Sequence, residues 1–394
     1  MNYLNPSSAT IGYCTNVHAG VDLASICSNL EEFAIPARDA SGAEELGVGL
    51  WIPAQAAGEL TDGVERFRQF LRDRRLRAFT INAFPYDNFH QPVVKRAVYS
   101  PEWWQPERLD YTLRLANILT QLLPREETTG SISTLPIAWG DGRANPENLA
   151  KAGAHMRVLA KKLGKIEEST GKRIVVAIEP EPGCVLDTTQ DVVDWFEREL
   201  PETDHRRYLG VCHDICHSAV MMESQQEVLS RLVEAGVMIG KVQVSNAIIA
   251  DWLSMATGRQ REAIAQLSEF AEDRYLHQTG RLKSDGTFEL AEDLPELLRS
   301  AASEEEPACG DQRWIVHFHV PIFLERFGHL RTSQDDTLEC LRFLNQNRTA
   351  EFTGHLEVET YAWTVLPHSM RRRGLSEDIA REISWLREIV SDMA

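Results

Sequence analysis

The stretch Arg173–Gly183 (RIVVAIEPEPG) joins a run of β-branched and apolar residues to an acidic, proline-rich end. A short apolar run of this kind is typical of a strand buried on both faces of a parallel sheet. A helix is predicted directly before it, because Asn145, Pro146 and Glu147 form an N-terminal cap signature and Gly171 suits a C-terminal cap. This part of the chain therefore indicates a sheet whose strands alternate with helices.

The same pattern, a short apolar run followed by a longer segment with helical periodicity, recurs along the whole chain. The further strand candidates are Ile11–Val17, Leu46–Ile52, Arg77–Ala83, Ser131–Ile137, Arg207–His213, Ile239–Ser245, Trp314–Val320 and Gly354–Thr360. Sustained alternation of this kind is typical of parallel strands joined by crossover helices, and about eight such units favour closure into a barrel. The sequence therefore predicts an α/β fold, a (β/α)8 TIM barrel, with residues 1–394 as a single domain.

Nine strand candidates compete for the eight places of such a barrel. The seventh, Ile239–Ser245, is separated from Trp314–Val320 by the 68 residues 246–313, which is more than a typical connection needs. We interpret this segment as an insertion after strand seven that carries Trp314–Val320 as an extra strand. A second long connection, 84–130, holds a predicted helix at Pro106–Leu123, and neither connection is rich enough in Gly and Ser to be a flexible linker.

The composition excludes several classes of protein. With 41 Lys and Arg against 59 Asp and Glu the formal charge is −18, and we find no basic cluster beyond Arg371–Arg373, so nucleic acid is not an expected partner. No apolar run approaches the ~20 residues that span a bilayer, and residues 1–12 lack the features of a secretory signal. Seven Cys fit reduced thiols better than a disulfide framework. We expect a cytoplasmic protein with a small-molecule substrate and leave its oligomeric state open.

Four of the predicted strands end in polar residues that could form a site. Parallel strands direct their C-terminal ends to one mouth of a barrel, and residues two apart on a strand share a face. Three carboxylates at such a mouth would repel one another unless they were protonated or a cation neutralised them. The alternative is that one or two of these acids face helix Lys or Arg outside the barrel. The predicted set is oxygen-rich and suits Mg²⁺ or Mn²⁺, or Zn²⁺ if a histidine joins: Glu179, Asp214, Gln243 and Glu359.

Histidines near the predicted mouth are candidate substrate-binding residues. His217 follows Asp214 in a D-x-x-H turn, where it could face a substrate or cap the next helix. His317 and His319 share one face of a strand and could bind metal or substrate, or lie in the core as ordinary hydrogen-bonded histidines. Weaker candidates for the rim are His18, Tyr86 and His90. No GxGxxG, GxxxxGK[ST], HExxH or GxSxG motif supports a nucleotide-binding or hydrolase function.

The order of these residues resembles the xylose isomerase-like TIM barrel superfamily, which includes sugar isomerases, ketose 3-epimerases and endonuclease IV-type repair enzymes. The matching features are Glu179 on strand five, Asp214 and His217 on strand six, a polar residue on strand seven and Glu359 on the last strand. More narrowly, stretches over nearly the whole chain resemble the EboE-type metabolite traffic proteins: YCTNVHAG, INAFPYDNFHQPVVKRAVYSPEW, GSISTLPIAWG, AIEPEPGCVLDT, CHDICHSAV, KVQVSNA, HFHVPIF and HLEVETYAW.

The resemblance to the epimerases implies a divalent metal (Mn, Mg or Zn) held by Glu179, Asp214, Gln243 and Glu359. It also implies that the two Glu are catalytic and move protons on opposite faces of the substrate. Gln243 departs from the His that these enzymes have on strand seven, and His317 or His319 could supply the missing imidazole.

The function that this resemblance implies is a metal-dependent sugar (phosphate) isomerase or epimerase acting on a small polyhydroxylated carbonyl metabolite. One alternative is a non-catalytic metabolite-binding or traffic protein of the EboE type. Another is an endonuclease IV-like phosphodiesterase, which the missing basic groove disfavours.

Overall fold

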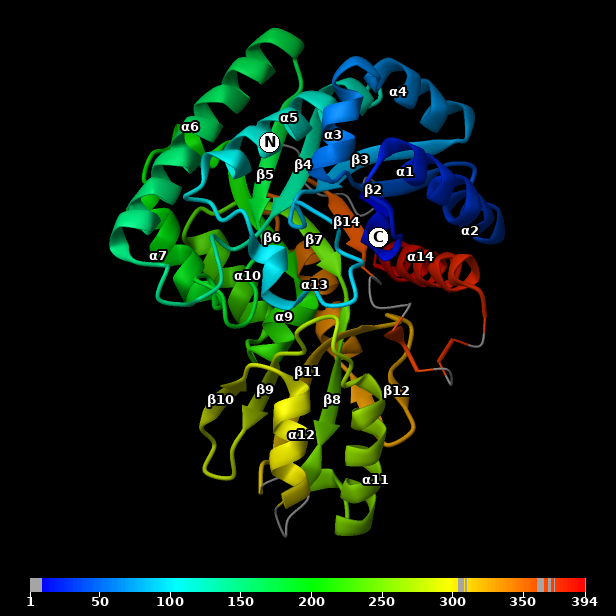
Figure 1. Ribbon diagram of the computed structural model, residues 1–394, viewed down its shortest axis with the longest axis vertical. Coiled ribbons are helices and arrows are strands. Elements are labelled where there is room, and N and C mark those ends of the chain that lie inside the picture. The colour runs from blue at the N-terminus through cyan, green and yellow to red at the C-terminus, as the bar shows by residue number, and fades with distance from the viewer. Residues whose placement is uncertain are drawn as a thin grey trace.

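Eight parallel strands close into a barrel in the computed structural model, which describes residues 9–303, 308, 310–359, 365–367, 370–371 and 373–393. Around the barrel the strand order is β1-β14-β7-β6-β5-β4-β3-β2, so the last strand of the chain pairs with the first. The predicted (β/α)8 barrel is confirmed (Figure 1). The strands are β1 Thr10–Cys14, β2 Leu46–Trp51, β3 Leu76–Asn82, β4 Thr129–Thr134, β5 Arg173–Ile178, β6 Leu209–Asp214, β7 Ile239–Val244 and β14 His355–Val358.

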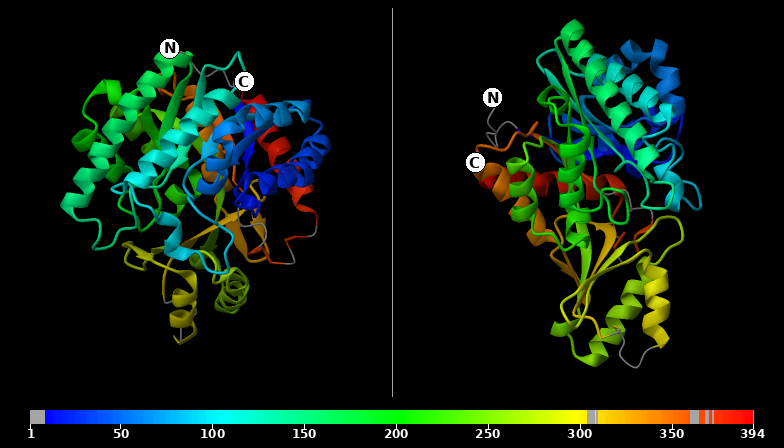
Figure 2. Two further views of the ribbon diagram at one scale, coloured as in Figure 1. Left: turned by 45° about the horizontal axis from the view of Figure 1, so that its top comes forward. Right: turned by 90° about the vertical axis from the view of Figure 1, so that its left-hand side faces the viewer.

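Helices surround the barrel and bury its outer face (Figures 1 and 2). The longest, α6 Pro146–Thr170, has the predicted caps: the Asn145 side chain accepts a hydrogen bond from the Asn148 amide, and Gly171 has φ +70°. The last helix begins at Leu375, after Gly374, so Ser376 lies inside its first turn. The others around the barrel are α1 Leu23–Asn29, α2 Ile35–Ala40, α3 Ala54–Glu59, α4 Val64–Asp73, α5 Pro106–Leu122, α7 Thr189–Glu199, α8 Thr203–Arg206, α9 Ile215–Val220, α10 Gln225–Glu234, α13 Gln334–Gln346 and α14 Leu375–Asp392.

The chain between β7 and α13 forms a second, six-stranded sheet, which lies beyond one end of the barrel (Figure 1). The predicted extra strand Trp314–Val320 is part of it, and five shorter strands that we did not predict complete the sheet in the order β10-β9-β11-β8-β13-β12. Two helices accompany these strands. The elements are β8 Asn246–Asp251, α11 Thr257–Leu267, β9 Thr279–Leu282, β10 Phe288–Ala291, α12 Leu294–Ser303, β11 Arg313–Val320, β12 Arg326–Phe327 and β13 Leu330–Thr332.

The two faces of the second sheet pack against different parts of the molecule. On β11, Trp314, Val316 and Phe318 belong to a buried cluster that also contains side chains of α11 and α12. Ile315, on the opposite face, packs against α9 of the barrel. Because side chains alternate along a strand, His317 and His319 point to the same side as Ile315, toward the barrel mouth. The right-hand view of Figure 2 shows α11 and α12 on the outer side of this sheet.

Contacts between loops join the second sheet to the barrel. The Val94 and Lys95 amides donate to the carbonyl of Arg274, at 2.8 and 3.0 Å, and Lys95 forms a 2.7 Å ion pair with Asp293. Whether barrel and second sheet behave as a single domain stays a prediction. None of the described helices is both long and apolar enough to cross a bilayer. Thr360 and Arg372, which belong to the predicted last strand and to the basic triplet, lie outside the described residues.

Candidate metal centre and active site

Three carboxylates meet at the mouth of the barrel. Glu179 follows β5, Asp214 ends β6 and Glu359 follows β14, and all three side chains are buried. One oxygen from each lies within 4.8 Å of the other two. We grouped these residues because side chains alternate along a strand, and in the structure the three carboxylates do lie together at the mouth.

Burial and mutual repulsion both destabilise the ionised forms of Glu179 and Glu359. Burial is the main cause that raises the pKa of Glu179 to about 7, and the nearby Asp214 adds to it. Burial, with the carboxylates of Glu179 and Asp214, also raises the pKa of Glu359 well above its ordinary value. For Asp214, burial is opposed by the His217 and His319 imidazoles and by hydrogen bonds, which together lower its pKa. The pKa values of the two glutamates are therefore raised, while that of the neighbouring Asp214 is lowered.

Gln243 on β7 is the register partner of Asp214 on β6, and it lines the pocket at this mouth. Its Nε2 donates to Asn82 Oδ1 at 3.1 Å, and Asn82 Oδ1 also accepts from Lys241 Nζ at 2.6 Å and from Ser133 Oγ at 3.1 Å. Three donors on one atom identify that atom as oxygen, which fixes the orientation of both amides. Among the described residues nothing donates to Gln243 Oε1, although the atom is buried. A buried acceptor without a donor is rare, and it marks a place where an external donor or cation fits.

Asp214 carries a second buried oxygen that receives no hydrogen bond from the described residues. Its Oδ1 accepts from Ser245 Oγ at 2.7 Å and from the His217 amide at 3.1 Å, and this caps α9. Its Oδ2 is buried and receives no hydrogen bond from the part of the chain that the structure describes. The Nε2 atoms of His217 and His319 each lie 3.9 Å from Oδ2. Asp214 thus stands between the carboxylates on one side and two imidazoles on the other.

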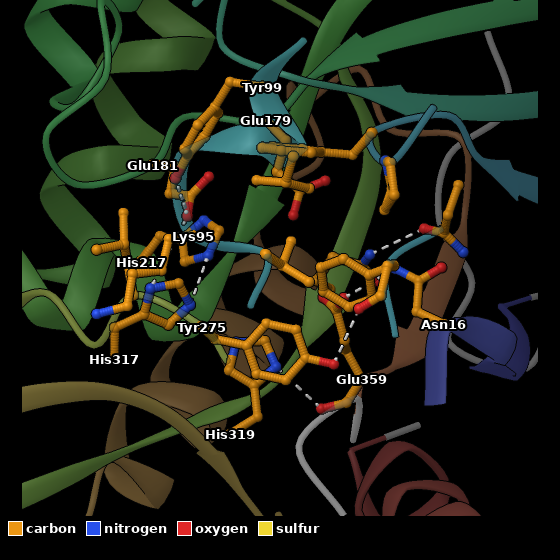
Figure 3. A pocket seen from close by; sticks show the side chains of 18 residues that line it. Asn16, Lys95, Tyr99, Glu179, Glu181, His217, Tyr275, His317, His319 and Glu359 are labelled. Carbon is orange, nitrogen blue, oxygen red and sulfur yellow. Dashed lines mark hydrogen bonds and ion pairs between the residues drawn. The ribbon is translucent and has the colours of Figure 1, made fainter. Parts of the chain in front are cut away.

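His217, His317 and His319 lie together at the pocket (Figure 3), with the ring centroid of His317 4.6 Å from that of His217 and 5.4 Å from that of His319. In each ring Nδ1 faces an oxygen: Pro180 O for His217 at 2.8 Å, Gln278 Oε1 for His317 at 2.8 Å and Glu359 O for His319 at 3.2 Å. Gln278 Nε2 is occupied by the carbonyl of Pro182, so its Oε1 is the atom facing His317.

Carbonyl oxygens only accept hydrogen bonds, so each Nδ1 carries a proton, and a ring in its neutral form presents the lone pair of Nε2. Burial lowers the pKa of His319 to about 4 and that of His317 well below its ordinary value. The pKa of His217 is raised, because Asp214, Glu181 and Glu179 outweigh the effect of burial. Rings whose Nδ1 faces a carbonyl, with Nε2 as the ligating nitrogen, are the arrangement in which histidine ligates metals.

A fully buried polar layer lies directly below the carboxylates, deeper in the barrel. Lys241 forms an ion pair with Glu357, whose Oε1 accepts from Asn82 Nδ2 at 3.0 Å. Burial alone would lower the pKa of Lys241, but the carboxylate of Glu357 raises it above its ordinary value. Gly49 makes room for this pair, because a Cβ at that position would lie 1.2 Å from Glu357 Oε1. The layer closes the floor of the site with charges that are already paired.

A pocket of about 600 Å³, partly open to solvent, extends from the carboxylates toward the second sheet. His217, His317, His319, Glu179, Gln243 and Glu359 all line it. Glu181 also lines it and holds the hydroxyl of Tyr99 at 2.8 Å. We did not predict Glu181 as a site residue, although it lies two positions beyond Glu179 and the period-two rule extended past the strand end would have found it. Tyr275, Lys95 and Asn16 carry no signal in the sequence that singles them out.

Three weaker candidates, His18, Tyr86 and His90, are not among the residues that line this pocket. His18 is buried, where it stacks on Phe33 with ring centroids 4.7 Å apart and its Nε2 lies 3.0 Å from the Tyr13 hydroxyl. Tyr86 packs edge-on against Tyr111 at 4.9 Å. The Nε2 of His90 is 2.7 Å from the backbone carbonyl oxygen of Asn16.

Solved structures with a similar fold were found, whereas no protein-family model and no curated protein sequence match the chain. A xylose isomerase-like TIM barrel protein from Mycobacterium smegmatis, in complex with magnesium, has a TM-score of 0.55 with 10% identity, covering 100% of this chain and 99% of that one. The fold is that of the xylose isomerase-like TIM barrels.

Two further structures are more distant. The 3-keto-D-glucoside 4-epimerase YcjR from E. coli has a TM-score of 0.46 and 12% identity, with 97% of this chain and 100% of that chain covered. A xylose isomerase domain protein from Alicyclobacillus acidocaldarius has a TM-score of 0.46 and 11% identity, with coverage of 97% and 99%.

Proposed function

We propose that this protein is a divalent-metal-dependent isomerase or epimerase acting on a small polyhydroxylated carbonyl metabolite. The observation that carries the proposal is the convergence of Glu179, Asp214 and Glu359 with two buried oxygens, on Asp214 and Gln243, that no described donor satisfies. Carboxylate and amide oxygens are ligands for Mg²⁺ and Mn²⁺, and the adjacent imidazoles extend the donor set toward Zn²⁺. These residues therefore fit a divalent metal.

We assign the two kinds of donor to two parts of one centre. Glu179, Asp214, Gln243 and Glu359 form the oxygen side, and the imidazoles of His217, His317 and His319 form the nitrogen side, with Asp214 between them. When bound, a divalent cation would polarise neighbouring carbonyl and hydroxyl oxygens of a substrate. This reassigns the three histidines from substrate contacts to metal ligands or their immediate neighbours.

Glu179 and Glu359 would move the proton. A carboxyl whose pKa is near 7, as burial makes that of Glu179, can take a proton from carbon or return it at neutral pH. Burial and the neighbouring carboxylates raise the pKa of Glu359 as well, and we assign the second proton transfer to this residue. Catalysis by either glutamate needs the polar floor of Lys241, Glu357 and Asn82 to keep the mouth rigid.

The test is exchange of carbon-bound hydrogen with solvent. The protein loaded with Mn²⁺, Mg²⁺ or Zn²⁺ is incubated in D₂O with D-fructose, D-tagatose or dihydroxyacetone, and deuterium at the carbon next to the carbonyl is followed by NMR. We expect exchange by the wild type and a loss of about 100-fold or more in Glu179→Gln and in Glu359→Gln, both with unchanged circular dichroism. Glu289→Gln, at an exposed position on β10, is the control. Full activity in both active-site variants, or no exchange by the wild type with any metal, would contradict the proposal.

A second candidate is a metabolite-binding or traffic protein of the EboE type, without turnover. Gln243 favours it, because an amide replaces the imidazole that the epimerases place on this strand. Elemental analysis after incubation with Mn²⁺ or Zn²⁺ separates the two, since a stoichiometric metal is expected only for the enzyme. An endonuclease-like phosphodiesterase is disfavoured, because Lys95 is the one cationic side chain among the described residues that line the pocket.

A further inference from the structure

The pocket has two chemically different ends. Its lower end, at the barrel mouth, is lined by the carboxylates, amides and imidazoles described above. Its upper end lies between the loop after β3 and the second sheet, and the side chains there are apolar or aromatic: Phe84, Phe89, Val94, Val98, Tyr275 and Leu276. A sugar can set one C–H face against an aromatic ring but carries hydroxyls around its edge, so an apolar wall of this extent suits a ligand with an apolar body better than a purely polyhydroxylated one.

Contacts between the barrel loop after β3 and the segment before β9 hold the apolar wall in place. The rings of Phe89 and Tyr275 are in contact, with centroids 4.9 Å apart and planes inclined by 32°. Tyr275 Oη donates to the carbonyl of Phe89 at 3.2 Å, and the Val94 and Lys95 amides bind the carbonyl of Arg274. These bonds cross from the barrel loop to the second sheet. The wall is therefore built before a ligand arrives, which lowers the entropic cost of binding against it.

A phosphate group finds no counterpart in the described lining. Lys95 is its one cation, and that ammonium is committed to Asp293 at 2.7 Å, which also accepts from the His277 amide. The acidic side chains of Glu179, Glu181 and Glu359 line the same space and add no positive charge that would hold a dianion.

We propose that the ligand of this pocket is unphosphorylated and bipolar: adjacent carbonyl and hydroxyl oxygens at one end meet the metal centre, and a ring-sized apolar body at the other contacts the wall of Phe89, Tyr275 and Val98. The identity of the polar end rests on the proposed function. The apolar body and the absence of phosphate rest on the wall and the charges alone.

Three probes with one head and different bodies test this proposal. Hydroxyacetone, 1-hydroxy-3-phenylpropan-2-one and dihydroxyacetone phosphate share the α-hydroxyketone and differ in a hydrogen, a phenyl or a phosphate at C3. Their dissociation constants are measured by calorimetry on the Mn²⁺-loaded wild type. We expect the phenyl compound to bind at least about tenfold more tightly than hydroxyacetone, because its ring is removed from water on binding. Dihydroxyacetone phosphate should bind no better than hydroxyacetone. Equal affinities for the first two, or a preference for the phosphate, would overturn the proposal.

Two substitutions in the apolar wall test whether the phenyl group binds there. Phe89→Ala should reduce the phenyl preference by about threefold or more, and Val98→Thr, which keeps the shape of the side chain but adds a hydroxyl, should reduce it without disturbing the fold. Phe288→Ala removes an exposed ring on β10 that does not line the pocket and should leave the preference unchanged. A preference that survives both wall variants contradicts the proposed position. Selectivity without any hydrogen exchange would count against the catalytic function alone, and exchange with a preference for phosphate would count against this inference alone.

Discussion

His217 and His317 face each other through their Nε2 atoms, 3.2 Å apart, while the Nδ1 of each ring faces a carbonyl oxygen. Both Nδ1 atoms must carry protons, so two neutral rings would bring two lone pairs together. Either one ring takes up an extra proton or a cation lies close to both nitrogens. The rings come from parts of the chain 100 residues apart, one from the barrel and one from the second sheet.

Removing one ring of this pair should weaken zinc binding. In His317→Ala the nitrogen side loses a donor, and we expect the affinity for Zn²⁺ to fall by about tenfold or more, measured by competition with a chromogenic chelator. Affinity for Mg²⁺, which prefers oxygen ligands, should change much less. His329→Ala, at a partly exposed position between β12 and β13, is the matched control. Zinc binding that is equal in wild type and His317→Ala would show that this ring is not part of the metal centre.

Gly49 should be indispensable for the floor of the site. Its Cβ position coincides with the Glu357 carboxylate, which cannot move without breaking its ion pair with Lys241. Gly49→Ala should therefore lower the free energy of unfolding by about 2 kcal/mol or more in urea titrations. Gly258 lies in α11 with open space around its Cβ, and Gly258→Ala should instead stabilise the protein by about 1 kcal/mol. Equal effects of the two substitutions would refute this account of the floor.

Glu382 should make stability depend on pH. It is buried on α14, where its Oε1 accepts from the Ile322 amide at 3.0 Å, and burial raises its pKa from 4.5 to about 8. Below pH 4.5 the carboxyl is neutral in the folded and the unfolded chain, so it has no effect there. Between about pH 4.5 and 8 the unfolded chain ionises first, and the wild type loses stability as the pH rises.

The variant Glu382→Gln keeps an acceptor for Ile322 but does not ionise. Relative to the wild type it should gain stability between pH 5 and 8, by up to ~4 kcal/mol, with no gain at pH 4. Thermal unfolding at several pH values measures this difference. Glu388→Gln, at an exposed position on the same helix, is the control. A gain at pH 4 as large as that at pH 8 would mean that packing, and not the ionisation of Glu382, is responsible.

The barrel could be predicted because its strands are apolar on both faces and its helices carry caps at their ends. Arg173–Glu179 and Pro106–Leu123 were located to within a residue or two for this reason. The strand β8 was missed because it follows β7 after Ser245 alone, so no turn residue separates them. The strands β9, β10, β12 and β13 have two to four residues each, too few for a period to be seen.

The carboxylates of the site could be predicted from strand alternation, but the position of the histidines could not. His317 and His319 were known to share a face, yet which face meets the barrel depends on α9 packing against Ile315. The apolar wall has no local signal, because Phe89 and Tyr275 are brought together by tertiary contacts between segments 186 residues apart.

The central claim is that the carboxylates and Gln243 hold a divalent cation. Crystals grown with Mn²⁺ and measured near its absorption edge test this directly, because only the metal gives a strong anomalous signal there. We predict an anomalous peak within ligand distance of Glu179, Asp214, Gln243 Oε1 and Glu359, lost in Asp214→Asn crystals. Ordered side chains with no peak among them at millimolar Mn²⁺ would contradict the account.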